Sequence, residues 1–190
     1  MSGPRVYASW VVAAALMGAC LSSNASAAGF SLDIPTIKPH STLSEAQVYN
    51  SFGCKGKNIS PAMTWSGAPD GTKSFAVTVY DPDAPTGSGW WHWVLYNIPA
   101  TVRALPEHAG DVDGRQLPSG AAQGRTDFGT PGFGGACPPA GDRPHRYIFT
   151  VYALKTEKID VPPGSTAAMV GYMLNANQLA KSSVTALYGR

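Results

Sequence analysis

The sequence has few charged residues and lacks the charge patterns and motifs of several protein classes. Only 14% of its 190 residues are Asp, Glu, Lys or Arg, and the formal net charge is +2. It contains no block of lysines and arginines that would neutralise a nucleic-acid backbone, so we do not expect nucleic acid as a partner. The HExxH, GxSxG and P-loop motifs are missing too, and no serine is placed as an activated nucleophile. These absences argue against catalysis, and we predict neither a cofactor nor a metal.

An apolar run long enough to cross a membrane is also missing. Residues 10–21 are almost entirely apolar, but this run falls short of the roughly 20 residues that a spanning helix needs. A basic residue precedes it and the small residues 25–27 follow it, which is the order found in a cleaved signal peptide. We therefore expect a signal peptide over 1–27 and one periplasmic or secreted domain over 28–190, without a transmembrane span. The alternative is lipid attachment at Cys20.

Glycine and proline are abundant, with 21 and 16 residues, and this composition is typical of short strands joined by many turns. Segments 74–80, 91–98 and 146–154 are rich in β-branched and aromatic residues and predict strands. The last of them is apolar on both faces, which predicts a central position. Residues 99–144 are irregular and are expected to contain short β pieces. The sequence therefore predicts a mostly β fold.

Period-two alternation predicts which way the side chains of 91–98 point. It places His92 on one face of that strand together with Val94, Tyr96 and Ile98. One face is thus expected to carry an ionisable group at the end of an otherwise apolar row.

The C-terminal part predicts short helical segments followed by a strand. Two consecutive prolines and a glycine break the chain, and Ser165 then has the character of an N-cap for a helix to about Leu174. A second helical turn is predicted over 177–181, and a closing strand over 184–188.

Polar residues gather at the ends of the predicted strands. Asp81 and Asp83 follow the first of these strands directly, and His92 begins the next. His145 and Tyr147 stand at the start of the last strand. Since strand ends meet at the rims of a sandwich, we expect these residues around one cavity. A histidine kept charged by carboxylates, beside backbone N–H groups, binds a small anion. The alternative interpretation is an ordinary turn and satisfied structural histidines.

Two cysteines remain after the predicted signal peptide, Cys54 and Cys137. Export places them in an oxidising compartment, where an even count indicates a disulfide. The alternative is two separate thiols.

Three segments of the chain carry a family resemblance: DPDAP, WWHWVLYNIP and GACPPAGDRPHRY. They resemble the two signature regions of the phosphatidylethanolamine-binding proteins, also called Raf kinase inhibitor-like proteins, and the exported bacterial branch in particular. The resemblance implies an antiparallel Greek-key β-sandwich with a ligand pocket at one rim. Such a pocket accepts phosphate, carboxylate or a phospholipid head group. Because family members inhibit kinases or proteases, the resemblance also implies a possible protein partner of that kind.

The same resemblance implies the residues of the pocket. The positions that it assigns to ligand binding are Asp81, Asp83, Trp90, His92, Pro139, His145 and Tyr147. Cys137 stands where the eukaryotic motif has glycine, so we expect a bridge from Cys137 to Cys54 to narrow or rigidify the pocket. Two alternatives remain, a hydrolase or metal-dependent enzyme that uses Asp81, His92 and His145, and a structural envelope protein with a vestigial pocket.

Overall fold

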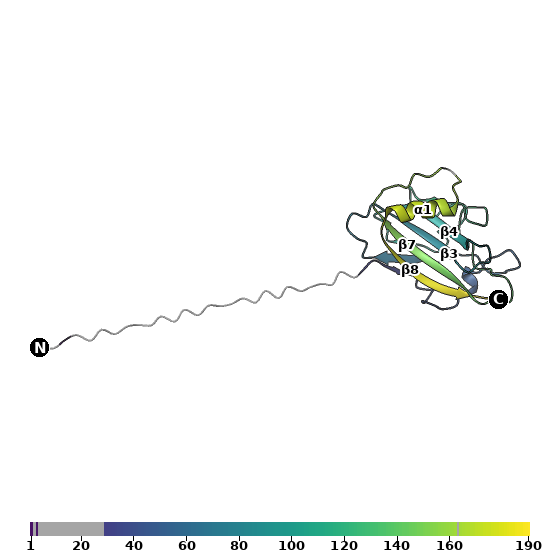
Figure 1. Ribbon diagram of the computed structural model, residues 1–190, viewed down its shortest axis with the longest axis horizontal. Coiled ribbons are helices and arrows are strands. Elements are labelled where there is room, and N and C mark those ends of the chain that lie inside the picture. Colours follow the sequence, from purple (N-terminus) through teal and green to yellow (C-terminus); the bar gives the residue numbers. More distant parts are fainter. Residues whose placement is uncertain (2, 4–28, 163) are drawn as a thin grey trace.

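The computed structural model describes residues 1, 3, 29–162 and 164–190. Nearly all of the expected signal peptide, with Cys20, lies outside these residues. The signal peptide and the domain boundary therefore stay predictions. The described residues form two antiparallel sheets and one α-helix (Figure 1).

The larger sheet has the strand order β6-β4-β3-β7-β8, and the smaller sheet has the order β1-β2-β5. Neighbouring strands in both sheets are antiparallel. The elements are β1 (Ser31–Asp33), a 3-10 helix η1 (Glu45–Gln47), β2 (Met63–Ser66), β3 (Ser74–Asp81), β4 (Trp90–Pro99), β5 (Ala104–Leu105), β6 (Ala122–Gln123), β7 (His145–Leu154), α1 (Ala167–Asn177) and β8 (Gln178–Tyr188). The predicted mostly β sandwich is confirmed.

The three long strands lie where the sequence predicts them. β3, β4 and β7 each contain the predicted segment and extend it by one or two residues. β7 pairs with β3 on one side and with β8 on the other, which confirms its central position. β5 and β6 are the short β pieces expected within the irregular region.

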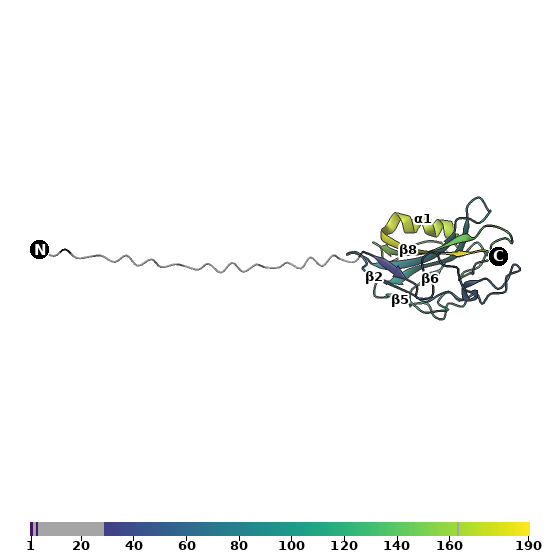
Figure 2. The same ribbon diagram turned by 90° about the horizontal axis from the view of Figure 1, so that it is seen from below.

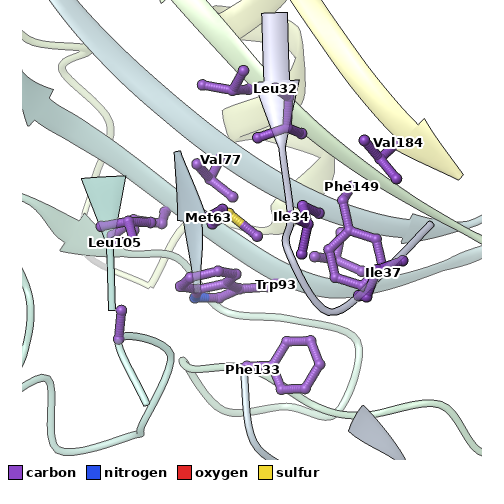
Figure 3. Packing of buried hydrophobic residues seen from close by; sticks show 14 of the residues in the cluster. Leu32, Ile34, Ile37, Met63, Val77, Trp93, Leu105, Phe133, Phe149 and Val184 are labelled. Carbon is purple, nitrogen blue, oxygen red and sulfur yellow. The ribbon is translucent and has the colours of Figure 1, made fainter. Parts of the chain in front are cut away.

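The main hydrophobic core lies between the two sheets (Figure 3). Met63 and Leu105 from the smaller sheet pack against Val77, Trp93 and Phe149 from the larger sheet. These five side chains are almost completely buried. Burying a side chain of this size stabilises the fold by about 2 kcal/mol relative to leaving it exposed.

The other face of the larger sheet is covered by α1 (Figure 2). Val170 and Leu174 of the helix pack with Ala76 and Val94 of the sheet in a second apolar cluster. Both faces of β3 are therefore buried, which explains its continuous apolar sequence.

The C-terminal segment differs from the prediction in two respects. The N-cap of α1 is Thr166, one residue after Ser165, and its hydroxyl oxygen accepts a 3.2 Å hydrogen bond from the Met169 N–H. The predicted second helical turn over 177–181 is wrong, because β8 begins at Gln178 and pairs with β7 along its length. Pairing with a central strand overrides the local helix preference there.

A bulge in β4 overturns the alternation predicted for this strand. Val79 pairs with Trp93 but Tyr80 pairs with Trp91, so the ladder shifts at His92. Val94 contributes to the cluster under α1, whereas the His92 ring packs against Tyr147 of the main core, with ring centroids 5.1 Å apart. His92 therefore points away from the face that holds Val94, toward the end of the sandwich.

Candidate functional site

A cavity of about 190 Å³ lies where β3 ends and β4 and β7 begin. Because β3 runs antiparallel to both neighbours, its last residues lie beside the first residues of the other two strands. We call this cavity the rim pocket. Its lining consists of Phe52, Asp81, Ala84, Pro85, Thr86, Trp90, His92, Phe128, Cys137, Pro138, Pro139, His145 and Tyr147.

The rim pocket brings together all but one of the residues that the sequence singles out. Those in the lining are Asp81, Trp90, His92, Pro139, His145 and Tyr147. Asp83 lies outside the lining.

Asp83 is instead held by two arginines. Its carboxylate accepts hydrogen bonds of 2.8 and 2.9 Å from the Arg146 guanidinium and one of 3.0 Å from the Arg146 backbone N–H. Arg143 donates a further bond of 3.2 Å. The hydrogen bonds from the Arg146 side chain lower the pKa of Asp83 from 3.8 to about 2. Asp83 thus fastens the loop after β3 to the start of β7 and has its oxygens occupied.

Asp81 and His145 form a buried pair at the back of the rim pocket. His145 Nδ1 lies 2.8 Å from Asp81 Oδ2, and only 3% of each side chain is exposed. The other oxygen of Asp81 accepts a 2.8 Å hydrogen bond from the Asp83 backbone N–H. Both oxygens of Asp81 therefore have partners within the protein, and its role in the geometry is to orient His145.

His92 is buried and its two ring nitrogens have different surroundings. Nδ1 donates a 2.7 Å hydrogen bond to the carbonyl oxygen of Gly134, which fixes the proton on that nitrogen because a carbonyl only accepts. Burial lowers the pKa of His92 below its ordinary 6.5, and the Gly134 carbonyl and the Asp81 charge only partly oppose this. The ring is therefore neutral near pH 7, and Nε2 is an acceptor. His92 is therefore not the histidine that carboxylates keep charged; the histidine in contact with carboxylates is His145.

Tyr147 carries a hydroxyl group without a partner. Only 1% of the residue is exposed, and its oxygen makes no hydrogen bond to the described residues. Burial, helped by the Asp81 charge, raises the pKa of Tyr147, although the nearby Cys137 backbone N–H acts in the opposite direction. The hydroxyl therefore keeps its proton. An unpaired buried hydroxyl costs about 1–3 kcal/mol, and this one belongs to a residue that lines a cavity.

The walls of the rim pocket are apolar, and most of them were missed at the level of sequence. Phe128 packs edge-on against Trp90 at 5.4 Å between centroids and lies 5.9 Å from Phe52. Phe128 also sits directly on Gly134, where an added Cβ would come within 2.2 Å of Phe128 Cε2. Phe52 and Phe128 are single aromatics in glycine-rich loops, so no periodicity marks them. Their only signal is an aromatic residue isolated among turn formers.

Cys54 and Cys137 form a disulfide, which excludes the alternative of two separate thiols. The bridge ties the loop that carries Phe52 to the segment Cys137-Pro138-Pro139. Both segments contribute to the lining of the rim pocket. The disulfide therefore joins two of its walls.

The sequence model of the family described as phosphatidylethanolamine-binding protein matches residues 33–189. The chain belongs to this family. It is 60% identical over 170 residues to the UPF0098 protein YbcL of Escherichia coli (strain K12), covering 90% of this chain and 93% of YbcL. The crystal structure of E. coli YbcL, described as a new member of the mammalian PEBP family, matches with a TM-score of 0.84 and 61% identity. That match covers 86% of this chain and 99% of the YbcL chain.

The chain is also similar to two further bacterial proteins. The UPF0098 protein YbhB of E. coli (strain K12) is 53% identical over 146 residues, which cover 77% of this chain and 91% of YbhB. The putative lipoprotein LppC of Mycobacterium tuberculosis (strain H37Rv) is 39% identical over 115 residues, covering 60% of this chain and 52% of LppC. The family fold is thus established, and the ligand has to be argued from the rim pocket.

The described part of the chain has neither a cluster of metal-ligating side chains nor an apolar helix of membrane-spanning length. Within residues 29–162 and 164–190, no three His, Cys, Asp or Glu side chains are grouped so that they would hold a metal ion. That includes Asp81, His92 and His145, which the enzyme alternative invokes. No helix in the same residues has the length and apolar character that crossing a membrane requires.

Proposed function

We propose that the rim pocket binds a small acidic group, a phosphate or a carboxylate, together with one proton. The observation that carries the proposal is the buried Tyr147 hydroxyl, which has no hydrogen-bond partner among the described residues although Tyr147 belongs to the pocket lining. Its ring lies 5.1 Å from that of His92, whose Nε2 is a free acceptor in the neutral state. A donor and an acceptor on two neighbouring rings match an acid group that still carries its proton.

The proton follows from the charge of His92. A fully ionised ligand cannot donate to Nε2, so the histidine has to take up a proton before it attracts such a ligand. Burial disfavours protonation of His92, as its lowered pKa shows. A bound anion favours protonation because it attracts the positive charge. In either description the complex holds one proton more than the free partners when the pH is above both the pKa of His92 and the pKa of the ligand.

The size and the walls of the rim pocket restrict the ligand further. A volume of about 190 Å³ is below the roughly 300–1,000 Å³ of drug-sized sites, so it suits a head group and not a whole lipid. Trp90, Phe128 and Pro139 form an apolar surround. The group that fits is a compact acid attached to an apolar or small organic substituent, such as a phospholipid head group.

We infer that the protein acts outside the cytoplasm and that ligand binding modulates a protein partner. The Cys54–Cys137 disulfide is typical of an oxidising compartment, in keeping with cleavage of residues 1–27. The relative LppC is named a putative lipoprotein. Phe52 is 63% exposed at the pocket, which suits contact with an extracellular or envelope partner such as a kinase or protease.

Tyr147→Phe tests the proposal because it removes only the unpaired hydroxyl. Inorganic phosphate is titrated into the wild type and the variant by calorimetry, and their unfolding free energies are compared. We expect phosphate affinity to fall about tenfold with stability unchanged or slightly raised, since the hydroxyl stabilises nothing in the free protein. Tyr96→Phe, on the α1 side of the sheet, is the matched control and should bind as the wild type does. No binding by the wild type, or equal binding by Tyr147→Phe, would overturn the proposal.

A further inference from the structure

His145 contacts a second carboxylate through the ring nitrogen that does not face Asp81. His145 Nε2 lies 3.4 Å from Asp142 Oδ2, while Nδ1 lies 2.8 Å from Asp81 Oδ2. The His145 side chain is 3% exposed and that of Asp142 is 42% exposed. The imidazole ring of His145 thus lies between a buried carboxylate, that of Asp81, and a carboxylate in contact with solvent, that of Asp142.

Asp142 belongs to a different cavity from the rim pocket. This second cavity, of about 410 Å³, is lined by Thr42, Asp142, Pro144, Leu187, Tyr188, Gly189 and Arg190. His145 lines the rim pocket and Asp142 does not. Asp142 is therefore close enough to act on a ligand through its charge and through His145, without contacting that ligand.

The other charged or titratable groups around His145 are accounted for. Those groups are Asp81, Asp83, His92, Arg143, Arg146, Tyr147 and Tyr188, and Arg190 lines the second cavity together with Asp142. Arg143 and Arg146 are engaged by Asp83, and His92 and Tyr147 are neutral near pH 7. Among the described residues, Asp142 has no ion-pair partner besides His145. With Asp81 and Asp142 ionised and His145 protonated, these three side chains together carry one negative charge, while Arg143 and Arg146 exceed Asp83 by one positive charge.

We infer that Asp142 sets the charge behind the rim pocket and thereby selects singly charged acids over doubly charged ones. This inference rests on the proposed function. Each negative charge on a bound ligand is repelled by Asp142, so a dianion is penalised more than a monoanion. The favoured ligand class is a phosphodiester or a carboxylate, and a phosphate monoester dianion is disfavoured. Asp142 is in this sense a positioning residue that determines specificity.

Two small esters that differ by one charge test the inference. Methyl phosphate and dimethyl phosphate are titrated by calorimetry at pH 8 and constant ionic strength, and the ratio of their affinities is recorded. Asp142→Asn should shift this ratio about threefold toward methyl phosphate, the size expected for one charge across a partly solvated contact. Asp142→Glu keeps the charge and should keep the wild-type ratio.

Asp160→Asn is the matched control, because it removes the same charge from an exposed residue beyond the other end of β7. It should leave the ratio unchanged. An unchanged ratio in Asp142→Asn, or an equal shift in Asp160→Asn, would overturn this inference alone. A wild type that binds neither ester would overturn the proposed function instead.

Discussion

The side chains of Asp81 and His145 are separated by 64 positions in the chain, yet Oδ2 and Nδ1 lie 2.8 Å apart with both side chains buried. The pair exists because β3 and β7 are antiparallel neighbours, so the end of one strand meets the start of the other. The contact occupies Nδ1 of His145 and one oxygen of Asp81. Both residues line the rim pocket. Two groups of the lining that make no hydrogen bond to the described residues are His92 Nε2 and the Tyr147 hydroxyl.

The arginine clamp on Asp83 predicts a specific dependence of stability on pH. The folded-state pKa of about 2 lies below the ordinary 3.8, so the stabilisation is present above about pH 4 and is lost as the pH falls toward 2. We expect Asp83→Asn to lower the free energy of unfolding by about 1 kcal/mol at pH 7, a discounted value because Arg143 and Arg146 are exposed. Denaturant unfolding at pH 7 and pH 2 measures this. A loss of equal size at both pH values would contradict the clamp.

The contact between Gly134 and Phe128 predicts a coupled pair of substitutions. Gly134→Ala places a Cβ where Phe128 Cε2 lies only 2.2 Å away, so the ring has to move. We expect a loss of about 1–3 kcal/mol of stability together with weaker phosphate binding. In a Phe128→Ala background the same change should cost much less, and a double-mutant cycle measures the coupling. Additive effects would show that the clash is relieved elsewhere.

The disulfide predicts linked effects on stability and on the rim pocket. Cys54 and Cys137 are 83 positions apart, and closing a loop of that size contributes about 4 kcal/mol in the chain-entropy model. The double variant Cys54→Ser/Cys137→Ser should lose stability of this order. It should also bind phosphate more weakly under conditions where it remains folded, because two walls are no longer joined. If the folded double variant bound phosphate as tightly as the wild type, the disulfide would stabilise the fold without shaping the rim pocket.

Much of the architecture was predictable because the long strands are rich in β-branched and aromatic residues. The long strands β3, β4 and β7 follow from dense β-branched and aromatic runs, and the convergence of Asp81, His92 and His145 follows from their places at strand ends. The direction of His92 did not follow, since a bulge breaks the alternation without leaving a mark in the sequence. The predicted strand 184–188 covers only the second half of β8, because pairing with β7 outweighs the helix preference of the preceding residues.

The chemistry of the site was less accessible than its location. The family resemblance implies that Asp83 contacts the ligand, whereas its oxygens accept hydrogen bonds from Arg146 and Arg143. The sequence also predicts a histidine kept charged by carboxylates without showing which one, and burial lowers the pKa of His92, whereas His145 is the histidine that carboxylates contact. Both differences come from burial and long-range partners, which depend on the whole fold and not on the neighbouring residues.

Proton uptake during binding tests the central claim most directly. Dimethyl phosphate does not titrate near neutrality, so any proton taken up on its binding belongs to the protein. Calorimetry at pH 8 in two buffers of different ionisation enthalpy should show uptake approaching one proton per ligand, with affinity rising as the pH is lowered toward 6, because the bound anion raises the lowered pKa of His92. Binding with no proton uptake and with the same affinity at pH 6 and pH 8 would contradict the account.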